Sequence, residues 1–328
     1  MQVNRSCLWR VAAALLSGGI FSNAFAAEPG YPQRPIRFVI PQSPGGASDT
    51  VGRVVAQKLS ERLGQPFVID NRPGATGNVG AELVKNAPAD GYTMLLTAAN
   101  LVTSPGLYQR VPFDPIKDFA PVSQLAQSPN VWIVHPSFAA RTMKELIDIA
   151  KGKPGQIDFS SSGLASTQHL AGELLNFMAA IKLVHIPYKG GGPALIDLLS
   201  GRVPVMVSSL PSAIPHIRTG KARALAVTSA KRSSAMPELP AVAEAAGFTD
   251  YEAVTWQGLV FPAAVPRSIV GHVSTDTIKV LALSEVKDRL LGLGYEPVGS
   301  TPAQFASFIG AELRRWPKII KAAGIKAE

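Results

Sequence analysis

The sequence predicts an α/β protein made of two lobes, each a mostly parallel sheet flanked by helices. Two patterns indicate this class: short apolar runs alternate with longer segments of helical apolar spacing, and glycine-rich loops join strands to the helices that follow. Length supports two lobes, because 328 residues are too many for one small domain.

The first strand–loop–helix unit sets the pattern for the chain. The apolar run Ile36–Ile40 predicts a buried strand, and apolar residues from Val51 to Leu63 recur at helical spacing. A helix is expected from about Ser166 to Ala180, with Leu170, Leu174 and Phe177 on one face. The other expected strands are 67–69, 92–97, 131–134, 157–160, 184–186, 205–207 and 222–228. The other expected helices are 78–86, 143–150, 193–199, 213–219, 268–283, 285–291 and about 302–323.

Residues 1–26 have the pattern of a secretory signal peptide. Arg5 and Arg10 give a positive start, residues 11–20 are apolar, and a small-residue cleavage site ends at Ala26. Cleavage there would remove Cys7, the one cysteine, and lower the net charge from +9 to +7. No later apolar run is long enough for a membrane span, so we expect a soluble, exported protein.

The composition and the missing motifs exclude several function classes. Basic residues are scattered and are not interleaved with aromatic residues, so nucleic acid is not an expected partner. The sequence has no phosphate-binding P-loop, no dinucleotide fingerprint, no zinc-protease helix and no complete nucleophile elbow. The five histidines show no metal-ligand spacing. We therefore expect no cofactor and no metal.

The stretch Pro41–Asp49 is the most informative segment, because it joins the first strand to the first helix through Gly45 and Gly46. The first N–H groups of a helix lack backbone partners, and the helix dipole adds partial positive charge there. Glycines allow a ligand close to the main chain, so the loop suits a small carboxylate. Alternatively, Ser48 or Asp49 only caps the helix and the glycines only turn the chain.

A second loop of this kind, Ser160–Thr167, lies in the other half of the chain and is rich in hydroxyl groups. Hydroxyl and free N–H groups are suitable donors to carboxylates. Thr97 and Asn100 lie at the end of a strand, and Tyr188 is expected to be exposed with an available hydroxyl. Two such loops in different halves predict a ligand held from both sides.

Two other glycine-containing loops, 72–78 and 187–193, are expected to be ordinary turns. Neither half supplies a nucleophile with an oriented base, so binding is expected rather than catalysis, with no catalytic residues. A hydrolase using Ser166 with His169 is the enzymatic alternative. At this spacing, however, helix-terminus hydrogen bonding is the expected role of these residues.

The chain resembles the Bug proteins, the periplasmic solute-binding components of tripartite tricarboxylate transporters. The matching segments run in order over nearly the whole mature chain. They are Tyr31-Pro32-x-Arg34-Pro35-Ile36, Pro44-Gly45-Gly46-x-x-Asp49, Asp70-Asn71-Arg72-Pro73-Gly74-Ala75, Ala89-Asp90-Gly91-Tyr92-Thr93, Ser162-Gly163-x-x-Ser166-x-x-His169-Leu170, Pro187-Tyr188-Lys189-Gly190, Leu225-Ala226-Val227-Thr228-Ser229 and Trp256-x-Gly258.

The resemblance implies a type II periplasmic binding-protein fold with the ligand in a cleft between the lobes. It implies that the Pro44–Asp49 loop and the loop around Ser162–Thr167 face each other and grip one carboxylate, partly through waters. It also implies a periplasmic location and delivery of a di- or tricarboxylate, acidic amino acid or aromatic carboxylate to membrane permease subunits. A sensor that presents the solute to a membrane kinase is the alternative.

We expect lobe 1 to contain residues 27–127 and 252–328 and lobe 2 residues 128–251, in a monomer. Ser208 and Ser209 stand where relatives often carry an acidic or amide group, so the far end of the pocket is expected to be neutral and hydroxyl-lined. The expected ligand-binding residues are Ser43, Gly45, Gly46, Ala47, Ser48, Asp49, Thr97, Asn100, Gly163, Ser166, Thr167, Tyr188 and Ser209.

Overall fold

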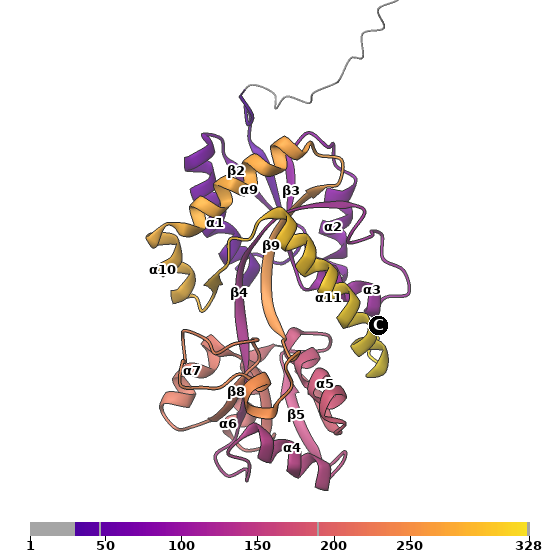
Figure 1. Cartoon of the computed structure of the whole chain (residues 1–328), viewed down its shortest axis with the longest axis vertical. Helices are drawn as coiled ribbons and strands as arrows, with labels where there is room; N and C mark the ends of the chain where they lie inside the picture. Colours follow the sequence, from indigo (N-terminus) through magenta and orange to yellow (C-terminus); the bar gives the residue numbers. More distant parts are fainter. Residues whose placement is uncertain (1–29, 46, 189, 327–328) are drawn as a thin grey trace, which may run out of the picture.

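The computed structural model describes residues 30–45, 47–188 and 190–326. The expected signal peptide lies outside the described residues, as does Gly46. Figure 1 shows an upper and a lower lobe joined by two long strands, β4 (Phe119–Val134) and β9 (Val254–Pro262). Within the described ranges, no helix combines the length and apolarity that a membrane crossing requires.

The upper lobe is built on a mixed sheet with strand order β2-β1-β3-β9-β4. Its first three strands are mutually parallel, and β9 runs antiparallel to both β3 and β4. The strands are β1 Ile36–Ile40, β2 Phe67–Asn71, β3 Thr93–Ala98 and the short β10 Glu296–Pro297, which pairs with β4. The helices are α1 Ala47–Leu63, η1 Ala75–Gly77, α2 Asn78–Lys85, α3 Asn100–Leu107, α9 Arg267–Ala282, α10 Ser284–Gly292 and α11 Pro302–Ala322.

Side-chain alternation along β1 explains why this sheet is covered on both faces. Ile36, Phe38 and Ile40 belong to the apolar cluster formed with α1 and α9. Val39 points to the opposite face and belongs to the cluster formed with α2, α3 and α11. A strand buried on both sides in this way is typical of a parallel sheet between helix layers.

The lower lobe repeats the arrangement around the end of β4. The strands β5 and β6 are parallel, β7 is parallel to β5, and β4 is antiparallel to both β7 and β8. The strands are β5 Ile157–Ser161, β6 Leu183–Pro187, β7 Val205–Ser209 and β8 Arg223–Val227. The helices are α4 Met143–Gly152, α5 Thr167–Ala179, α6 Gly191–Leu199, α7 Leu210–Arg218 and α8 Val242–Ala246.

The strand β4 contributes to both lobes. Its residues from Phe119 to Pro129 pair with β9, and its residues from Asn130 onward pair with β7. One apolar cluster contains both Trp132 of the lower lobe and Phe305 on α11, so the two lobes share a continuous core. The sheet changes partners between Pro129 and Asn130; the expected lobe boundaries at 127/128 and 251/252 remain a prediction.

The structure confirms the α/β class and the predicted strand–helix alternation, with three corrections. The strands β9 and β10, the first part of β4 and the helices α3 and α8 were not expected. The sheets are mixed, because β4, β8 and β9 run antiparallel to their neighbours. The expected apolar face of α5 was wrong at Phe177, which is 60% exposed, whereas Leu175 is buried.

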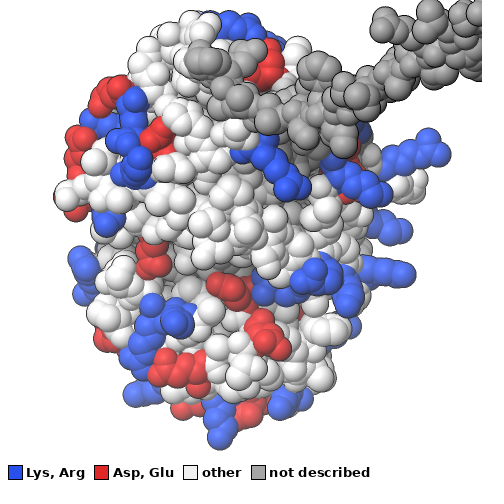
Figure 2. Space-filling view, turned by 45° about the horizontal axis from the view of Figure 1, so that its top comes forward, with Lys and Arg blue, Asp and Glu red and all other residues white. Residues whose placement is uncertain are grey.

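The face of the molecule drawn in Figure 2 carries Lys and Arg interspersed with Asp and Glu, rather than gathered in one basic patch. Several charged side chains of the described chain form ion pairs. Arg37 and Arg72 both bind Asp70, and Lys58 lies within 2.9 Å of both Glu61 and Glu285.

Candidate functional site

A buried carboxylate organises the loop that begins α1. Asp49 accepts hydrogen bonds from the Gly45 N–H at 2.9 Å, the Arg53 Nε at 2.8 Å and the Asn71 Nδ2 at 3.0 Å. The same Asn71 amide donates to the Gln42 carbonyl at 3.0 Å. Asp49 therefore ties the loop to its own helix and to the end of β2.

These hydrogen bonds show which groups of the loop are already paired within the protein. Asp49, the third residue of α1, accepts the N–H of Gly45 in the loop before the helix, so this N–H is not free for a ligand. Gly45 needs to be glycine for its φ of 79°. Ser48 is buried and Ser43 is exposed. Ala47 is the first residue of α1.

Two opposing effects set the pKa of the Asp49 carboxyl. Burial alone would raise its pKa, but the hydrogen bonds from Arg53, Gly45 and Asn71 outweigh burial and lower the pKa from 3.8 to about 2. A carboxylate whose pKa is lowered on folding contributes stability above its unfolded pKa and loses it as the pH falls toward the folded value.

We therefore expect Asp49→Asn to lower the free energy of unfolding by about 1–3 kcal/mol at pH 7, because charge-assisted hydrogen bonds are lost. The difference from wild type should shrink between pH 4 and pH 2. Urea denaturation at pH 7, 4 and 3 measures it, with the exposed Asp288→Asn on α10 as control. A difference that stays constant down to pH 3 would contradict the assigned role.

The end of β3 lies beside the same loop. Thr97 is buried, and Asn100 begins α3. Asn100 and Pro41 both lie beside Gly77: a Cβ on Gly77 would lie 2.4 Å from Asn100 Nδ2 and 3.3 Å from Pro41 Cβ. The Asn100 Oδ1 is buried and has no hydrogen-bond partner within the described part of the chain.

In the lower lobe, Ser166 caps α5. Its hydroxyl accepts the His169 N–H at 3.2 Å and donates to the Gly163 carbonyl at 2.8 Å. The expected helix-terminus role of Ser166 and His169 is confirmed. Thr167 makes a 2.8 Å hydroxyl contact with Thr255 on β9, which links the start of α5 to the upper sheet.

A cavity of about 270 Å³ opens beside this helix start. Its polar lining includes Ser162 and Gln168, whose hydroxyl and amide oxygen are 2.9 Å apart. Ser209 lines it too and donates to Ser212 at 2.7 Å. The remaining lining residues are Gly191, Gly192, Leu195, Met206, Val207 and Ser208. None of these side chains is charged, so the cavity suits a neutral polar group or the oxygens of an anion held by N–H and hydroxyl donors.

The expected role of Tyr188 needs correction. The residue is half-buried, and its hydroxyl donates to Asp197 Oδ2 at 2.7 Å instead of being exposed and free. Burial, together with this hydrogen bond, raises the pKa of Tyr188 to about 12. Tyr188 therefore ties the loop before α6 to Asp197 in the last turn of that helix.

The geometry around His169 does not form a serine–histidine dyad with Ser166. The Nδ1 atom of His169 accepts the Ala165 N–H at 3.0 Å, and its Nε2 lies 3.6 Å from Glu173 Oε1. Both ring nitrogens thus face groups other than the Ser166 hydroxyl. Among the described residues, no cluster of three or more His, Cys, Asp or Glu side chains could hold a metal ion.

The structure thus places the expected residues in two groups. In the upper lobe, Gly45 follows β1, Asp49 is the third residue of α1 and Asn100 begins α3. In the lower lobe, Ser166 and Ser209 are the N-cap residues of α5 and α7. Sequence reasoning did not single out Asn71, Arg53, Thr255 or Gln168. The i, i+4 spacing of Asp49 and Arg53 was a usable signal.

Comparison with known proteins identifies relatives over almost the whole chain. The model of the Tripartite tricarboxylate transporter family receptor (TctC) matches residues 51–325. A UPF0065 protein of Pseudomonas sp. strain P51, from a tcbD-tcbE intergenic region, is 40% identical over 290 residues, 88% of this chain and 86% of the relative. BugT of Bordetella pertussis is 35% identical over 298 residues, 90% of this chain and 91% of BugT.

A solved relative has the same fold. R. palustris Rpa4515, determined with adipate, superimposes with a TM-score of 0.74 at 36% identity, covering 90% of this chain and all of that protein.

Proposed function

The chain belongs to the tripartite tricarboxylate transporter receptor family, and we propose that it is a periplasmic binding protein that captures a small carboxylated solute for the membrane subunits of such a transporter. The match of the receptor model over residues 51–325, on a two-lobe fold, carries this proposal. Residues 1–26 would direct export and be removed after Ala26. The mature protein would act as a monomer.

The site geometry supports a carboxylate as the recognised group. The starts of α1 and α5 lie in different lobes, and each follows a strand of a parallel set. Backbone N–H groups at helix starts favour a negative charge, and Ser166 holds the start of α5 in place through its hydrogen bonds to Gly163 and His169. Because the solute contacts two lobes, binding would favour the closed arrangement of the hinge at β4 and β9.

We infer that the solute is released unchanged. The ring of His169 faces Ala165 and Glu173, so the base that a hydrolase would need at Ser166 is directed elsewhere. The lower-lobe cavity, lined by uncharged groups, would receive the far end of the solute.

Isothermal titration of the mature protein with adipate, together with thermal unfolding, tests the proposal. Adipate is the probe because Rpa4515 was determined with it. We expect saturable binding with a raised melting temperature, and full recovery of unaltered adipate after incubation. If neither adipate nor any of a panel of mono-, di- and tricarboxylates binds, the proposal is wrong.

Ser166→Ala is expected to weaken adipate binding about tenfold and to lower stability by about 1 kcal/mol, since the cap of α5 is lost. Thr142→Ala is the matched control, because Thr142 caps α4 by accepting the Glu145 N–H at 3.2 Å. This control should lose similar stability but bind adipate normally. Equal affinity of both variants would contradict a role for Ser166 in binding.

A further inference from the structure

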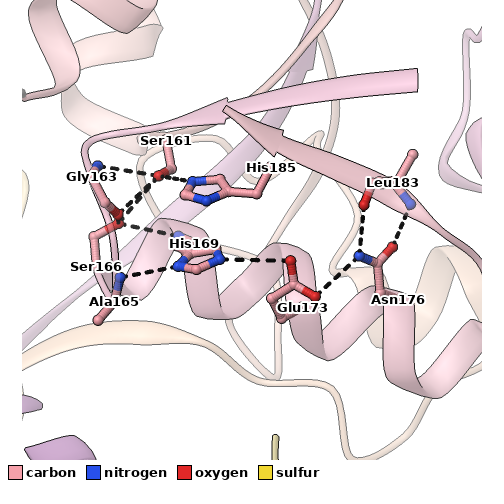
Figure 3. Close-up of polar contacts among 9 residues, drawn as sticks. All are labelled: Ser161, Gly163, Ala165, Ser166, His169, Glu173, Asn176, Leu183 and His185. Atoms are coloured by element: carbon pink, nitrogen blue, oxygen red, sulfur yellow. Dashed lines mark hydrogen bonds and ion pairs between the residues drawn. The ribbon is translucent and has the colours of Figure 1, made fainter. Parts of the chain in front are cut away.

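Two histidine rings lie stacked beneath the start of α5, as Figure 3 shows. The ring centroids of His169 and His185 are 3.6 Å apart and their planes differ by 11°. Phe159 packs beside the pair, with its ring centroid 5.0 Å from that of His185 and its plane tilted by 38°. His169 is 3% exposed and Phe159 is fully buried, so the pair lies at the edge of the lobe core.

His169 stabilises an uncommon backbone conformation in the loop before α5. Ala165, in the loop before α5, has a φ of 58°, in the left-handed region that costs a non-glycine residue about 1 kcal/mol. The Ala165 N–H donates to His169 Nδ1 at 3.0 Å. An imidazole nitrogen can accept this bond only while it carries no proton, so the proton of a neutral His169 lies on Nε2, facing Glu173.

His185 supports the other end of the same loop. Its Nε2 lies 2.7 Å from the Ser161 hydroxyl, and this hydroxyl accepts the Gly163 N–H at 3.2 Å. The Ser161 hydroxyl also lies 3.1 Å from the Gly163 carbonyl, which accepts from Ser166 as well, so Ser161 links His185 to both backbone groups of Gly163. Gly163 itself has a φ of 144°. The two imidazoles thus fix the loop at Gly163 and at Ala165.

The surroundings order this pair and keep His185 uncharged. Asn176 on α5 exchanges two hydrogen bonds with the backbone of Leu183, at 2.8 and 3.1 Å, which locks α5 to β6. Burial, reinforced by the neighbouring His169, lowers the pKa of His185 to about 3. The acidic side chain that faces the pair is Glu173, which lies near His169 Nε2 and also accepts a hydrogen bond from Asn176.

We propose that His169 and His185 are positioning residues of the solute site: the stacked pair holds the 162–166 loop in its left-handed turn, so that the helix start presents its donors to the solute carboxylate. This inference rests on the proposed function. It assigns both histidines a role in binding without direct contact with the solute.

Substitutions at His169 separate the hydrogen bond from ring packing. His169→Phe keeps a stacked ring but loses the acceptor, and should raise the adipate Kd about tenfold. His169→Asn loses the ring but places an amide oxygen where Nδ1 stood, and should stay within threefold of wild type. His185→Gln, whose amide oxygen can still accept from Ser161, should also stay within threefold. A purely structural role would instead make His169→Asn, which loses the ring, the poorest binder.

Hydrogen exchange of the free protein at neutral pH gives a readout that needs no solute. The Ala165 amide should be protected in wild type and His169→Asn and exchange at least tenfold faster in His169→Phe. Unchanged exchange in folded His169→Phe would overturn the proposal, as would faster exchange with wild-type adipate affinity. If wild type binds no carboxylate, the proposed function fails, and Ala165 exchange still decides whether His169 holds the loop.

Discussion

Gly163→Ala is expected to weaken adipate binding ten- to a hundredfold. The φ of 144° at Gly163 lies in a region that residues with a Cβ rarely adopt, and a Cβ there would lie 3.0 Å from the Tyr188 carbonyl. Strain of this kind costs of order 1–3 kcal/mol, so the loop would relax to another conformation. Because the loop begins α5, relaxation would misplace the donors that the solute requires.

Titration calorimetry measures this loss, and circular dichroism with thermal unfolding shows whether the fold persists. Gly152→Ala is the matched control, because Gly152 ends α4 in the same lobe and a Cβ there meets nothing within 4 Å. The control should bind adipate within twofold of wild type. A folded Gly163→Ala protein with wild-type affinity would show that this loop is not part of the site.

Gly258→Ala is expected to lower the free energy of unfolding by about 2–3 kcal/mol. Gly258 lies in β9 between Thr97 of β3 and Gln124 of β4. A Cβ there would lie 2.1 Å from Cζ of Phe305, a fully buried side chain whose ring also packs edge-on against Trp256. Phe305 would have to move within a filled core, and overpacking of this kind costs about 1–3 kcal/mol or more.

Urea denaturation followed by tryptophan fluorescence measures the effect on stability. Gly271→Ala serves as control, because Gly271 lies within α9 and a Cβ there meets nothing within 4 Å. Alanine in a helix interior is favoured over glycine by up to about 1 kcal/mol, so this variant should be as stable as wild type or more stable. Equal stability of Gly258→Ala and wild type would mean that Phe305 does not pack on the strand as described.

The elements that could be predicted from the sequence are those in which apolar residues recur at regular spacing. The run Ile36–Ile40 and the amphipathic α4 could be predicted because burial of a strand or of one helix face leaves a local pattern. The first half of β4 leaves none, because it contains Pro121 and Pro129, residues that are uncommon within strands. The structure accommodates Pro121 at a register shift in the pairing with β9.

The missed strand β9 has a related cause. It is buried along almost its whole length, so apolar and polar positions do not alternate, and Gly258 interrupts it. This segment forms a strand because it pairs with β3 and β4, which lie more than a hundred residues away in the sequence. The same long-range pairing makes both sheets mixed, which strand–helix alternation could not indicate.

For the candidate site, the sequence predicted the two loops but not the hydrogen-bond partners of their side chains. Glycines and hydroxyls between a strand and a helix marked both loops, and the cap at Ser166 followed from its spacing to His169. That Asp49 takes the Gly45 N–H depends on Asn71 at the end of a neighbouring strand. That Tyr188 turns to Asp197 depends on how α6 packs.

A crystal structure of the mature protein with adipate tests the central claim most directly: helix starts in two lobes bind one carboxylate. We expect one adipate carboxylate within hydrogen-bond distance, directly or through one water, of both the 43–49 loop and the 162–167 loop. A carboxylate bound by one loop alone, or held outside the cleft between the lobes, would contradict the account.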